Sequence, residues 1–297
     1  MSYDTPAAFR AALEARLNAS ARAGGRPVGR ARKIVAFSRL LARLRRAAPD
    51  RWVLKGGFAL ELRLAGHARA TRDIDLDWPG SLGQVTEALI AAAALDMGDH
   101  FEFQVVRIGD ADVGAGGGVR FRADCSVAGR LFEQLLIDVD TDQQSFSPVD
   151  ELTTPDLLDF AGIEPARVPA APLEQHLAEK LHAYTRIYGA DRPSSRPKDL
   201  VDMVIITELT TFEAGRLRDA IELVFANRAT HETPFAIPEP PHEWARPYAA
   251  LARDLELNTD PSRGHAQVAR LLDPLLGGQL TLQCWNPETL EWETVTE

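Results

Sequence analysis

The sequence predicts an α/β protein in which a mixed β-sheet domain is followed by a mainly helical C-terminal domain. Short segments of alternating apolar and polar residues, typical of half-buried strands, are concentrated between residues 51 and 140. After residue 170, apolar residues recur every three or four positions, as they do in amphipathic helices. A chain of 297 residues is long enough for two domains. We therefore expect N-terminal basic helices over 1–50, a sheet domain over 51–165, and a helical domain with a C-terminal hairpin over 170–297.

The composition is that of an ordinary globular protein, with 45% hydrophobic and 26% charged residues. No apolar run approaches the ~18 residues of a membrane span. The N-terminus lacks the charged and apolar regions of a signal peptide. Cys125 and Cys284 are too few and too far apart for a disulfide framework or a zinc site. We therefore expect a cytoplasmic protein that has no membrane partner.

The N-terminal region is basic, although the whole chain has a net charge of −10. Residues 1–51 carry twelve Lys and Arg against three Asp and Glu. Helices are expected over 1–20 and 30–48, and Arg39, Arg43 and Arg46 are placed on the polar face of the second helix. Such a face binds the phosphates of a nucleic acid or is simply solvated, and both interpretations stay open. These three arginines are the candidates for contacts with a nucleic-acid backbone.

A glycine turn and an acidic strand stand close together between residues 51 and 78. An apolar run at 52–54 turns at Gly56 and Gly57 into a helix-like segment over 58–64. Paired glycines let the backbone approach a ligand closely, and backbone N–H groups at a helix start bind phosphate oxygens. Asp73 and Asp75 follow, and side chains two apart in a strand share a face. Mg²⁺ is commonly held by one or two carboxylates together with substrate phosphates.

The order of strand, glycine turn, helix and acidic strand is typical of a nucleotidyltransferase. The stretch resembles the AbiEii-type abortive-infection toxins of the DNA polymerase β-like nucleotidyltransferase superfamily. The matching residues are Lys55-Gly56-Gly57 with Ala59-Leu60, and Thr71-Arg72-Asp73-Ile74-Asp75-Leu76. The resemblance implies that Lys55, Gly56 and Gly57 bind the nucleotide. Phe58 is a departure, because many members of the family carry Ser or Thr there and that hydroxyl would contact a phosphate.

Further strands and a third acidic position follow a helix expected over 82–95. Strands are expected over 101–108, 119–127 and 131–140, with a turn at 114–118 and a connection over 141–172. The last strand ends with Asp138 and Asp140 on one face. A two-metal centre needs a further carboxylate, which by resemblance lies on a later strand between apolar residues. Asp138 matches that context, Asp140 is the alternative, and an exposed strand end is the interpretation without a site.

Two helices, expected over 173–188 and 198–208, carry a second group of matching residues, and a loop is expected over 191–197. The matching residues are Glu179-Lys180-Leu181-His182-Ala183 and Arg196-Pro197-Lys198-Asp199-Leu200-Val201-Asp202. The resemblance implies that Lys180 reaches the triphosphate, that Lys198 or Arg196 adds charge there, and that Asp202 orients Lys180 or a nucleotide hydroxyl. A Lys and an Asp on adjacent helices are otherwise usually a surface ion pair.

The rest of the chain shows no residues that point to chemistry. Helices are expected over 212–225, 243–255 and 265–276. The tail over 280–295 alternates and should form a small hairpin carrying Trp285 and Trp292.

The resemblance implies that an NMP is transferred from an NTP to an acceptor hydroxyl, with release of pyrophosphate, by the toxin of a toxin–antitoxin pair. Asp73, Asp75 and Asp138 would hold Mg²⁺, or Mn²⁺ in its place, and Asp138 would help to deprotonate the nucleophile. Lys180 and Asp202 complete the expected catalytic set. The expected partners are an NTP, an RNA acceptor (in the first place the 3′ end of tRNA) and a cognate antitoxin. The alternatives are a protein or small-molecule acceptor, a metal-dependent phosphohydrolase, and a catalytically inactive nucleotide-binding module.

Overall fold

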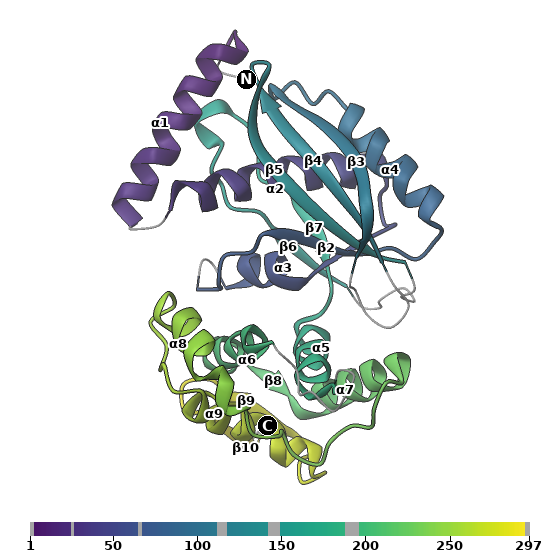
Figure 1. Ribbon diagram of the computed structural model, residues 1–297, viewed down its shortest axis with the longest axis vertical. Coiled ribbons are helices and arrows are strands. Elements are labelled where there is room, and N and C mark those ends of the chain that lie inside the picture. Colours follow the sequence, from purple (N-terminus) through teal and green to yellow (C-terminus); the bar gives the residue numbers. More distant parts are fainter. Residues whose placement is uncertain are drawn as a thin grey trace. The chain divides into compact units, whose positions relative to one another are not determined.

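The computed structural model describes residues 3–24, 27–64, 67–111, 118–141, 149–187 and 196–294. The chain divides into two compact units (Figure 1). The first unit comprises Met1–Arg63 and Ala70–Ala171, and the second comprises Leu64–Arg69 and Pro172–Glu297. Most of the turn expected at 114–118 and of the loop expected at 191–197 lies outside the described residues.

The first unit contains a seven-stranded sheet, which confirms the predicted mixed sheet. Its strands lie in the order β3-β4-β5-β2-β1-β7-β6. Strand β2 pairs with β5 in parallel and β1 pairs with β7 in parallel, whereas the other pairs are antiparallel. The strands are β1 (Val53–Lys55), β2 (Asp73–Asp77), β3 (Phe101–Ala111), β4 (Gly118–Val127), β5 (Arg130–Asp140), β6 (Asp150–Thr153) and β7 (Arg167–Ala170).

Helices cover the apolar face of this sheet. They are α1 (Pro6–Gly24), α2 (Val28–Ala47), α3 (Gly56–Arg63) and α4 (Leu82–Ala94). Helix α2 crosses the long strands, and α4 lies beside β3 (Figure 1). The ring of Phe37 on α2 packs edge-on against Phe58 on α3, with 4.9 Å between the ring centroids. Phe58, which departs from the family pattern, is therefore fully buried in the core between two helices. The basic N-terminal helices are part of the sheet unit.

Strands β6 and β7 lie within 141–172, which the sequence analysis interpreted as a connection without strands. Both are only four residues long, and β7 contains Pro169. The partner of β7 on one side is β1, more than a hundred residues earlier, with Leu54 opposite Ala170. A short, proline-containing segment carries almost no local strand signal, so its pairing depends on the tertiary structure.

The second unit is mainly helical, as predicted. Its helices are α5 (Leu173–Thr185), α6 (Pro197–Leu209), α7 (Ala214–Arg228), α8 (Ala245–Arg253) and α9 (Pro261–Leu276). The predicted hairpin is formed by β9 (Gln283–Asn286) and β10 (Glu291–Thr294), where Trp285 lies opposite Trp292. A two-residue strand, β8 (Phe212–Glu213), pairs with β9 and was not predicted. Over the part of the chain that the structure describes, no helix combines the length and the apolar character needed to span a membrane.

The predicted arginine face of α2 is wrong for two of its three residues. Arg39 and Arg43 are buried, with Arg43 at 0% exposure, and both bind the buried carboxylate of Asp99. Arg43 donates to both oxygens of Asp99, at 2.9 and 2.6 Å. Burial alone would raise the pKa of Asp99, but the hydrogen bond and charge of Arg43, together with Arg39, hold it below the ordinary value. Only Arg46 remains exposed.

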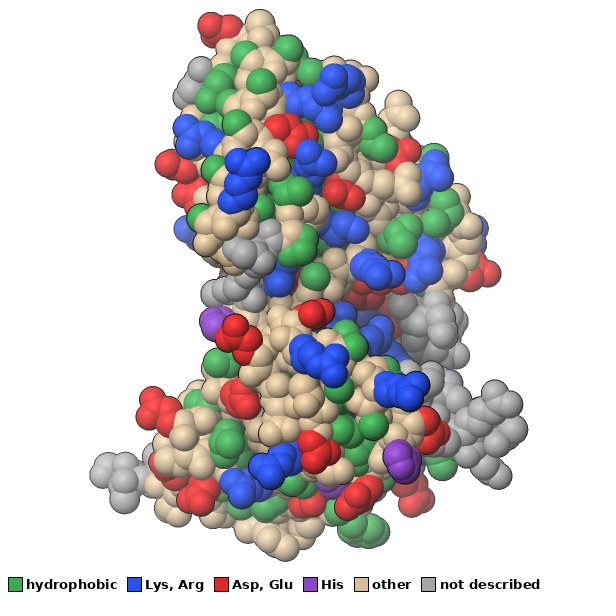
Figure 2. Space-filling model, turned by 60° about the vertical axis from the view of Figure 1, so that its left-hand side comes forward, with side chains coloured by type: hydrophobic (Ala, Val, Ile, Leu, Met, Phe, Trp, Pro, Cys, Tyr) green, Lys and Arg blue, Asp and Glu red, His purple; other side chains and the backbone are tan. Residues whose placement is uncertain are grey.

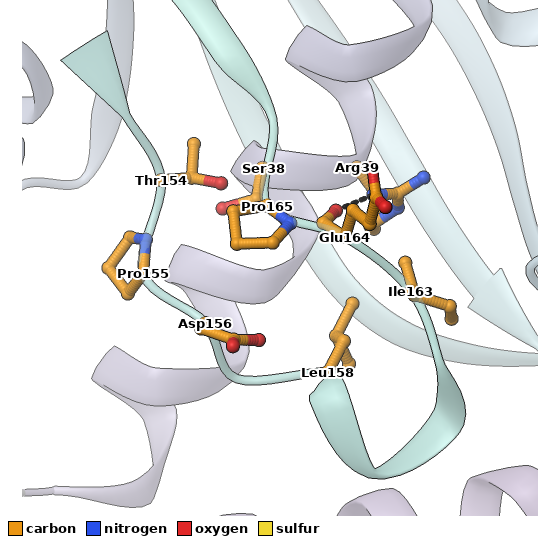
Figure 3. A pocket seen from close by; sticks show the side chains of 9 residues that line it. All are labelled: Ser38, Arg39, Thr154, Pro155, Asp156, Leu158, Ile163, Glu164 and Pro165. Carbon is orange, nitrogen blue, oxygen red and sulfur yellow. Dashed lines mark hydrogen bonds between the residues drawn. The ribbon is translucent and has the colours of Figure 1, made fainter.

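Arg39 and its neighbour Ser38, in the middle of α2, also line a small pocket (Figure 3). Its Nη1 donates to the backbone oxygen of Glu164 at 3.4 Å, on the wall opposite Thr154 and Pro155. Arg39 thus uses its guanidinium to connect α2 with Asp99 and with the segment before β7. No phosphate contact is needed to explain its charge.

Other basic N-terminal residues also bind groups of the same unit. Arg10 donates to the backbone oxygens of Val127 and Arg130, at 2.8 and 2.7 Å. Arg30 pairs with Glu61 at 2.7 Å, and Arg32 pairs with Glu14. Figure 2 shows Lys and Arg side chains interspersed with Asp and Glu on the face of this unit that it presents. The charges of Arg30, Arg32, Arg39 and Arg43 are therefore matched by carboxylates of the same unit.

Arg43→Gln should lower the free energy of unfolding by about 3–5 kcal/mol, because it removes one partner of a buried ion pair. Arg46→Gln, on the same helix but exposed, should change it by less than about 0.5 kcal/mol. Urea denaturation of the two variants at neutral pH checks the pair. An Arg43→Gln protein with wild-type stability and weakened RNA binding would restore the original prediction for this helix.

Candidate active site

The central strands place a row of carboxylates on one face of the sheet. Asp75 on β2 lies opposite Asp138 on β5, and Asp77 lies opposite Asp140. Asp73 precedes them on the same face of β2, because side chains alternate along a strand. The residues between them point to the other face, into the core under α2 and α4: Ile74, Leu76, Ile137 and Val139. The parallel pairing of β2 with β5 thus brings two acidic segments, 63 residues apart in the sequence, side by side.

Lys55 forms ion pairs with the last two carboxylates of this row, Asp77 and Asp140. It lies on β1 opposite Asp75. Its Nζ contacts the carboxylate of Asp77 and lies 3.2 Å from Oδ2 of Asp140. All three of these charged side chains are almost fully buried. Asp140, the alternative third carboxylate, is therefore held by a lysine inside the fold, and a contact between Lys55 and a nucleotide stays a prediction.

The glycine turn contacts the acidic strand directly. Gly56 begins α3 with a φ of +66°, in the left-handed region that favours glycine. A Cβ atom built on Gly56 would lie 1.8 Å from Oδ2 of Asp75. The Asp75 carboxylate thus fills the space that any other residue at position 56 would need. The sequence shows only that the glycine turn precedes the acidic strand. In the structure the two are in contact.

Thr71 orients the first carboxylate. Its Oγ1 donates a hydrogen bond to Oδ1 of Asp73 at 3.1 Å and lies 3.2 Å from the backbone oxygen of the same residue. The Thr71 side chain is itself buried. Thr71 belongs to the motif quoted from the sequence, but the sequence analysis gave it no role.

Arg120 binds the predicted third carboxylate and was missed by the sequence analysis. It lies on β4 opposite Asp138. Its Nε and Nη2 donate to the two carboxylate oxygens of Asp138, at 2.6 and 2.5 Å. The hydrogen bond with Asp138 raises the pKa of Arg120 above its usual range, and the charges of Asp138, Asp73 and Asp75 add to this effect. Arg120 is therefore part of the same electrostatic site as the two aspartates of β2.

The donor chemistry of Asp73 and Asp75 fits a hard divalent cation such as Mg²⁺, which takes one or two carboxylates and completes its shell with water and phosphate oxygens. Within the described residues, no three His, Cys, Asp or Glu side chains form a group that could hold a metal ion. Both oxygens of Asp138 instead bind Arg120. The three-carboxylate set predicted from the sequence stays a prediction, and its first two members fit the ion best.

The second unit contains the other predicted charged residues in one buried network. Lys180 on α5 binds Asp199 at 3.0 Å and Asp202 at 2.8 Å, both on α6. Asp202 also accepts two hydrogen bonds from Arg69, at 2.9 and 3.2 Å, and Arg196 pairs with Asp199 at 3.0 Å. Lys180 and Asp202 were predicted to act together, whereas no role was predicted for Asp199 or Arg69. Lys180 is thus held between two carboxylates and is not a flexible surface lysine.

The network fixes its members in the charged state. Burial alone would lower the pKa of Lys180, but Asp202 and Asp199 outweigh it and raise the pKa above the ordinary value. Burial alone would raise the pKa of Asp202, but Lys180 and Arg69 hold it below the ordinary value. Lys198, half-buried in the first turn of α6, has a lowered pKa because of burial and the neighbouring charge of Arg196. Three of the four lysines of the chain, Lys55, Lys180 and Lys198, therefore lie close to other charged side chains.

Asp202→Asn should lower the free energy of unfolding by about 3–5 kcal/mol near neutral pH, because Lys180 and Arg69 lose a buried partner. A depressed carboxyl pKa stabilises the fold above the unfolded-state value, about 3.9, and this stabilisation is lost as the pH falls through the folded-state value. The difference between wild type and variant should therefore narrow below about pH 4. Urea denaturation at pH 7, 5 and 3 measures it, with the exposed Asp219→Asn as the control that should follow wild type. A difference that stays constant down to pH 3 would contradict the assigned ion pairs.

Comparisons with known proteins identify the family and the fold of the chain. A family model described as nucleotidyl transferase AbiEii toxin, Type IV TA system, matches residues 39–276. The fold is similar to that of MenT4, the nucleotidyltransferase toxin Rv2826c from Mycobacterium tuberculosis H37Rv, with a TM-score of 0.58 and 20% sequence identity. That match covers 89% of this chain and 90% of the other. No curated protein matches the chain. At this level of identity the structural match concerns the fold alone.

Proposed function

The chain belongs to the AbiEii family of nucleotidyltransferase toxins of type IV toxin–antitoxin systems, and we propose that it transfers an NMP from an NTP to the hydroxyl of an RNA. The contact between Gly56 and Asp75 is the observation that supports this proposal most. It joins a glycine turn at a helix start, suited to phosphate oxygens, to a carboxylate suited to a cation. A phosphohydrolase would need the carboxylates but not this glycine turn.

Asp73 and Asp75 would hold a divalent ion, Mg²⁺ or Mn²⁺, which supplies charge stabilisation for the transferred phosphoryl group. Thr71 keeps Asp73 in place through the hydrogen bond to its Oδ1. The backbone of Gly56 and Gly57, at the first turn of α3, would bind phosphate oxygens of the NTP. Phe58 contributes packing only, so the cradle of this chain consists of backbone N–H groups without a side-chain hydroxyl.

In the second unit, Lys180 and Lys198 are proposed to bind nucleotide phosphates, with Asp202 holding Lys180 in position. The network contains four cations, Lys180, Arg69, Arg196 and Lys198, around two buried carboxylates. An excess of positive charge that is partly buried favours a bound anion such as a triphosphate. Asp138 is the third carboxylate of the first unit, and it would take part in activating the acceptor hydroxyl.

The acceptor is proposed to be RNA, with the 3′ end of tRNA first, because the AbiEii resemblance implies it. Of the three arginines predicted for RNA contacts, only Arg46 keeps that role, since Arg39 and Arg43 are buried with Asp99. A cognate antitoxin and an NTP follow from the family. A protein or a small molecule as the acceptor is the second candidate, since the same carboxylates would serve it.

Purified protein should be incubated with Mg²⁺ and each of the four α-labelled NTPs, with total RNA, with purified tRNA, or without RNA. We expect one NTP to label the tRNA band and the RNA-free reaction to stay unlabelled. Label on a protein band or a small molecule when RNA is absent would refute the RNA acceptor and leave nucleotidyl transfer standing. No label on any acceptor, with any NTP, would refute the proposed function itself.

A further inference from the structure

Arg120 and Asp138 form a bidentate ion pair in the candidate active site. The register of β4 on β5 places them directly opposite each other. Two parallel N–H···O bonds of 2.6 and 2.5 Å join them, so both oxygens of Asp138 are used. Bidentate bonds between a guanidinium and a carboxylate are among the strongest that side chains form. The carboxylate is almost fully buried, which protects this pair from solvent screening on the Asp138 side.

We propose that Arg120 is a permanent cation of the active site that takes the place of a second metal ion at Asp138, so that the site binds a single divalent ion at Asp73 and Asp75. This inference rests on the proposed function, because it assigns the contents of the same site. Asp138 is then a group that Arg120 holds in position, not a metal ligand.

Competition for Asp138 favours the arginine. A metal ion at Asp138 would have to displace a guanidinium that stays charged at every accessible pH. In two-metal sites the ions lie only about 3.5–4 Å apart. A second ion would therefore lie against Arg120, whose charge already interacts with Asp73 and Asp75. One divalent ion and one guanidinium together match the formal charge of Asp73, Asp75 and Asp138.

Arg120 also has the geometry to act on substrate. Its Nε and Nη2 bind Asp138, and its Nη1 makes no hydrogen bond to any residue that the structure describes. The Arg120 side chain is 38% exposed, whereas Asp138 is almost completely covered. A fixed guanidinium whose outer edge reaches solvent can donate to a phosphate oxygen as charge develops there. This is the contribution that a second metal ion makes in related chemistry.

The neighbouring arginine on the same strand shows that this pairing is specific. Arg122 lies two residues further along β4, on the same face, and its side chain is 41% exposed. It pairs with Asp124 through a single contact of 3.4 Å, and its partner on β5 is Leu136. Arg122 therefore matches Arg120 in residue type, strand and exposure, but it has no bond to a carboxylate of the site. It provides the matched control.

Binding of Mn²⁺ alone, followed by electron paramagnetic resonance titration, tests the proposal without measuring activity. We expect the wild-type chain to bind one Mn²⁺, Arg120→Met to bind a second, and Arg122→Met to bind one. The double variant Arg120→Met with Asp138→Asn should return to one. The melting temperature of Arg120→Met should also rise more with Mn²⁺ than that of wild type, because the ion replaces the lost partner of Asp138.

Asp138→Asn with Arg120 intact keeps the test decisive if Arg120→Met does not fold. Its Mn²⁺ affinity should stay close to that of wild type, because Asp138 is not a ligand. A loss of affinity of about tenfold or more, which is the smallest loss expected when even an outer-shell partner of a metal site is removed, would overturn the proposal. Two ions bound by wild type, or one by a folded Arg120→Met protein, would overturn it too. Each of these contradicting results leaves the proposed function standing as long as Asp75→Asn still abolishes Mn²⁺ binding. A wild-type protein that binds no Mn²⁺ would instead refute both the metal site and this inference.

Discussion

Asp75→Asn should fold like wild type and lose nucleotidyl transfer by at least ~10²-fold, because a carboxylate that holds the cation is replaced by a neutral amide. The side chain keeps its size, so the space beside Gly56 remains filled and the core face of β2 is unchanged. The measurement is the initial rate of label transfer from the preferred NTP, together with a circular dichroism melt that confirms the fold.

Asp124→Asn is the matched control for this variant. Asp124 is a partly exposed carboxylate of the same sheet, on β4, and it pairs with Arg122 away from Asp73 and Asp75. It should keep the wild-type rate. Loss of the charge stabilisation that the metal ion provides should slow the reaction by far more than about twofold. If a folded Asp75→Asn protein keeps a rate within about twofold of wild type, β2 is not the catalytic strand.

Gly56→Ala should lose transfer to a similar extent, by about 10²-fold, because a displacement of a catalytic group by ~1 Å can cost that much. The added Cβ would lie 1.8 Å from Oδ2 of Asp75, so the carboxylate has to move. The left-handed φ of +66° adds a backbone strain of about 1–3 kcal/mol for any residue other than glycine. Rates and urea denaturation should be measured for the same preparations.

Gly129→Ala separates strain from the contact with Asp75. Gly129 has the same φ of +66°, but a Cβ built there meets nothing within 4 Å. It should therefore lose stability by about 1–3 kcal/mol and keep the wild-type transfer rate. Equal rates for the Gly56→Ala and Gly129→Ala proteins would show that the Gly56 contact does not position Asp75 for catalysis.

The parts of the site that the sequence predicted are the ones that local patterns determine. Alternation placed Asp73 and Asp75 on one face and Ile74 on the other, and the glycine pair marked the start of α3. These are properties of a strand and of a helix start, and each depends on a few neighbouring residues. The family resemblance rests on the same local segments, which is why it identified the sheet unit correctly.

The pairing of Arg120 with Asp138 could not be predicted, because a register shift determines it. Near the turn between β4 and β5, Ser126 lies opposite Leu131. A bulge between Cys125 and Ser126 then shifts the register of the two strands by one residue, so that Cys125 lies opposite Glu133. Without that bulge, Arg120 would lie opposite Ile137 and not Asp138. A one-residue change of register exchanges the two faces of a strand, and the alternation alone does not reveal it.

The arginines of α2 failed as predictions for a similar reason. Helical periodicity indicates which residues share a face, but it does not show which part of that face another element covers. Arg43 is buried because Asp99, between α4 and β3, lies against it and accepts two of its hydrogen bonds. Arg46, three residues later, remains exposed. A buried guanidinium with a carboxylate partner looks the same in sequence as an exposed one.

The most direct test of nucleotidyl transfer compares two labels on the same NTP. With purified protein, Mg²⁺ and tRNA, the α-labelled NTP should label the tRNA, whereas the γ-labelled NTP should release its label as pyrophosphate. Both signals should disappear with Asp75→Asn. Transfer of the γ-label to any acceptor, or release of inorganic phosphate without labelling of an acceptor, would contradict nucleotidyl transfer and favour a phosphoryl-transfer or hydrolytic activity at these carboxylates.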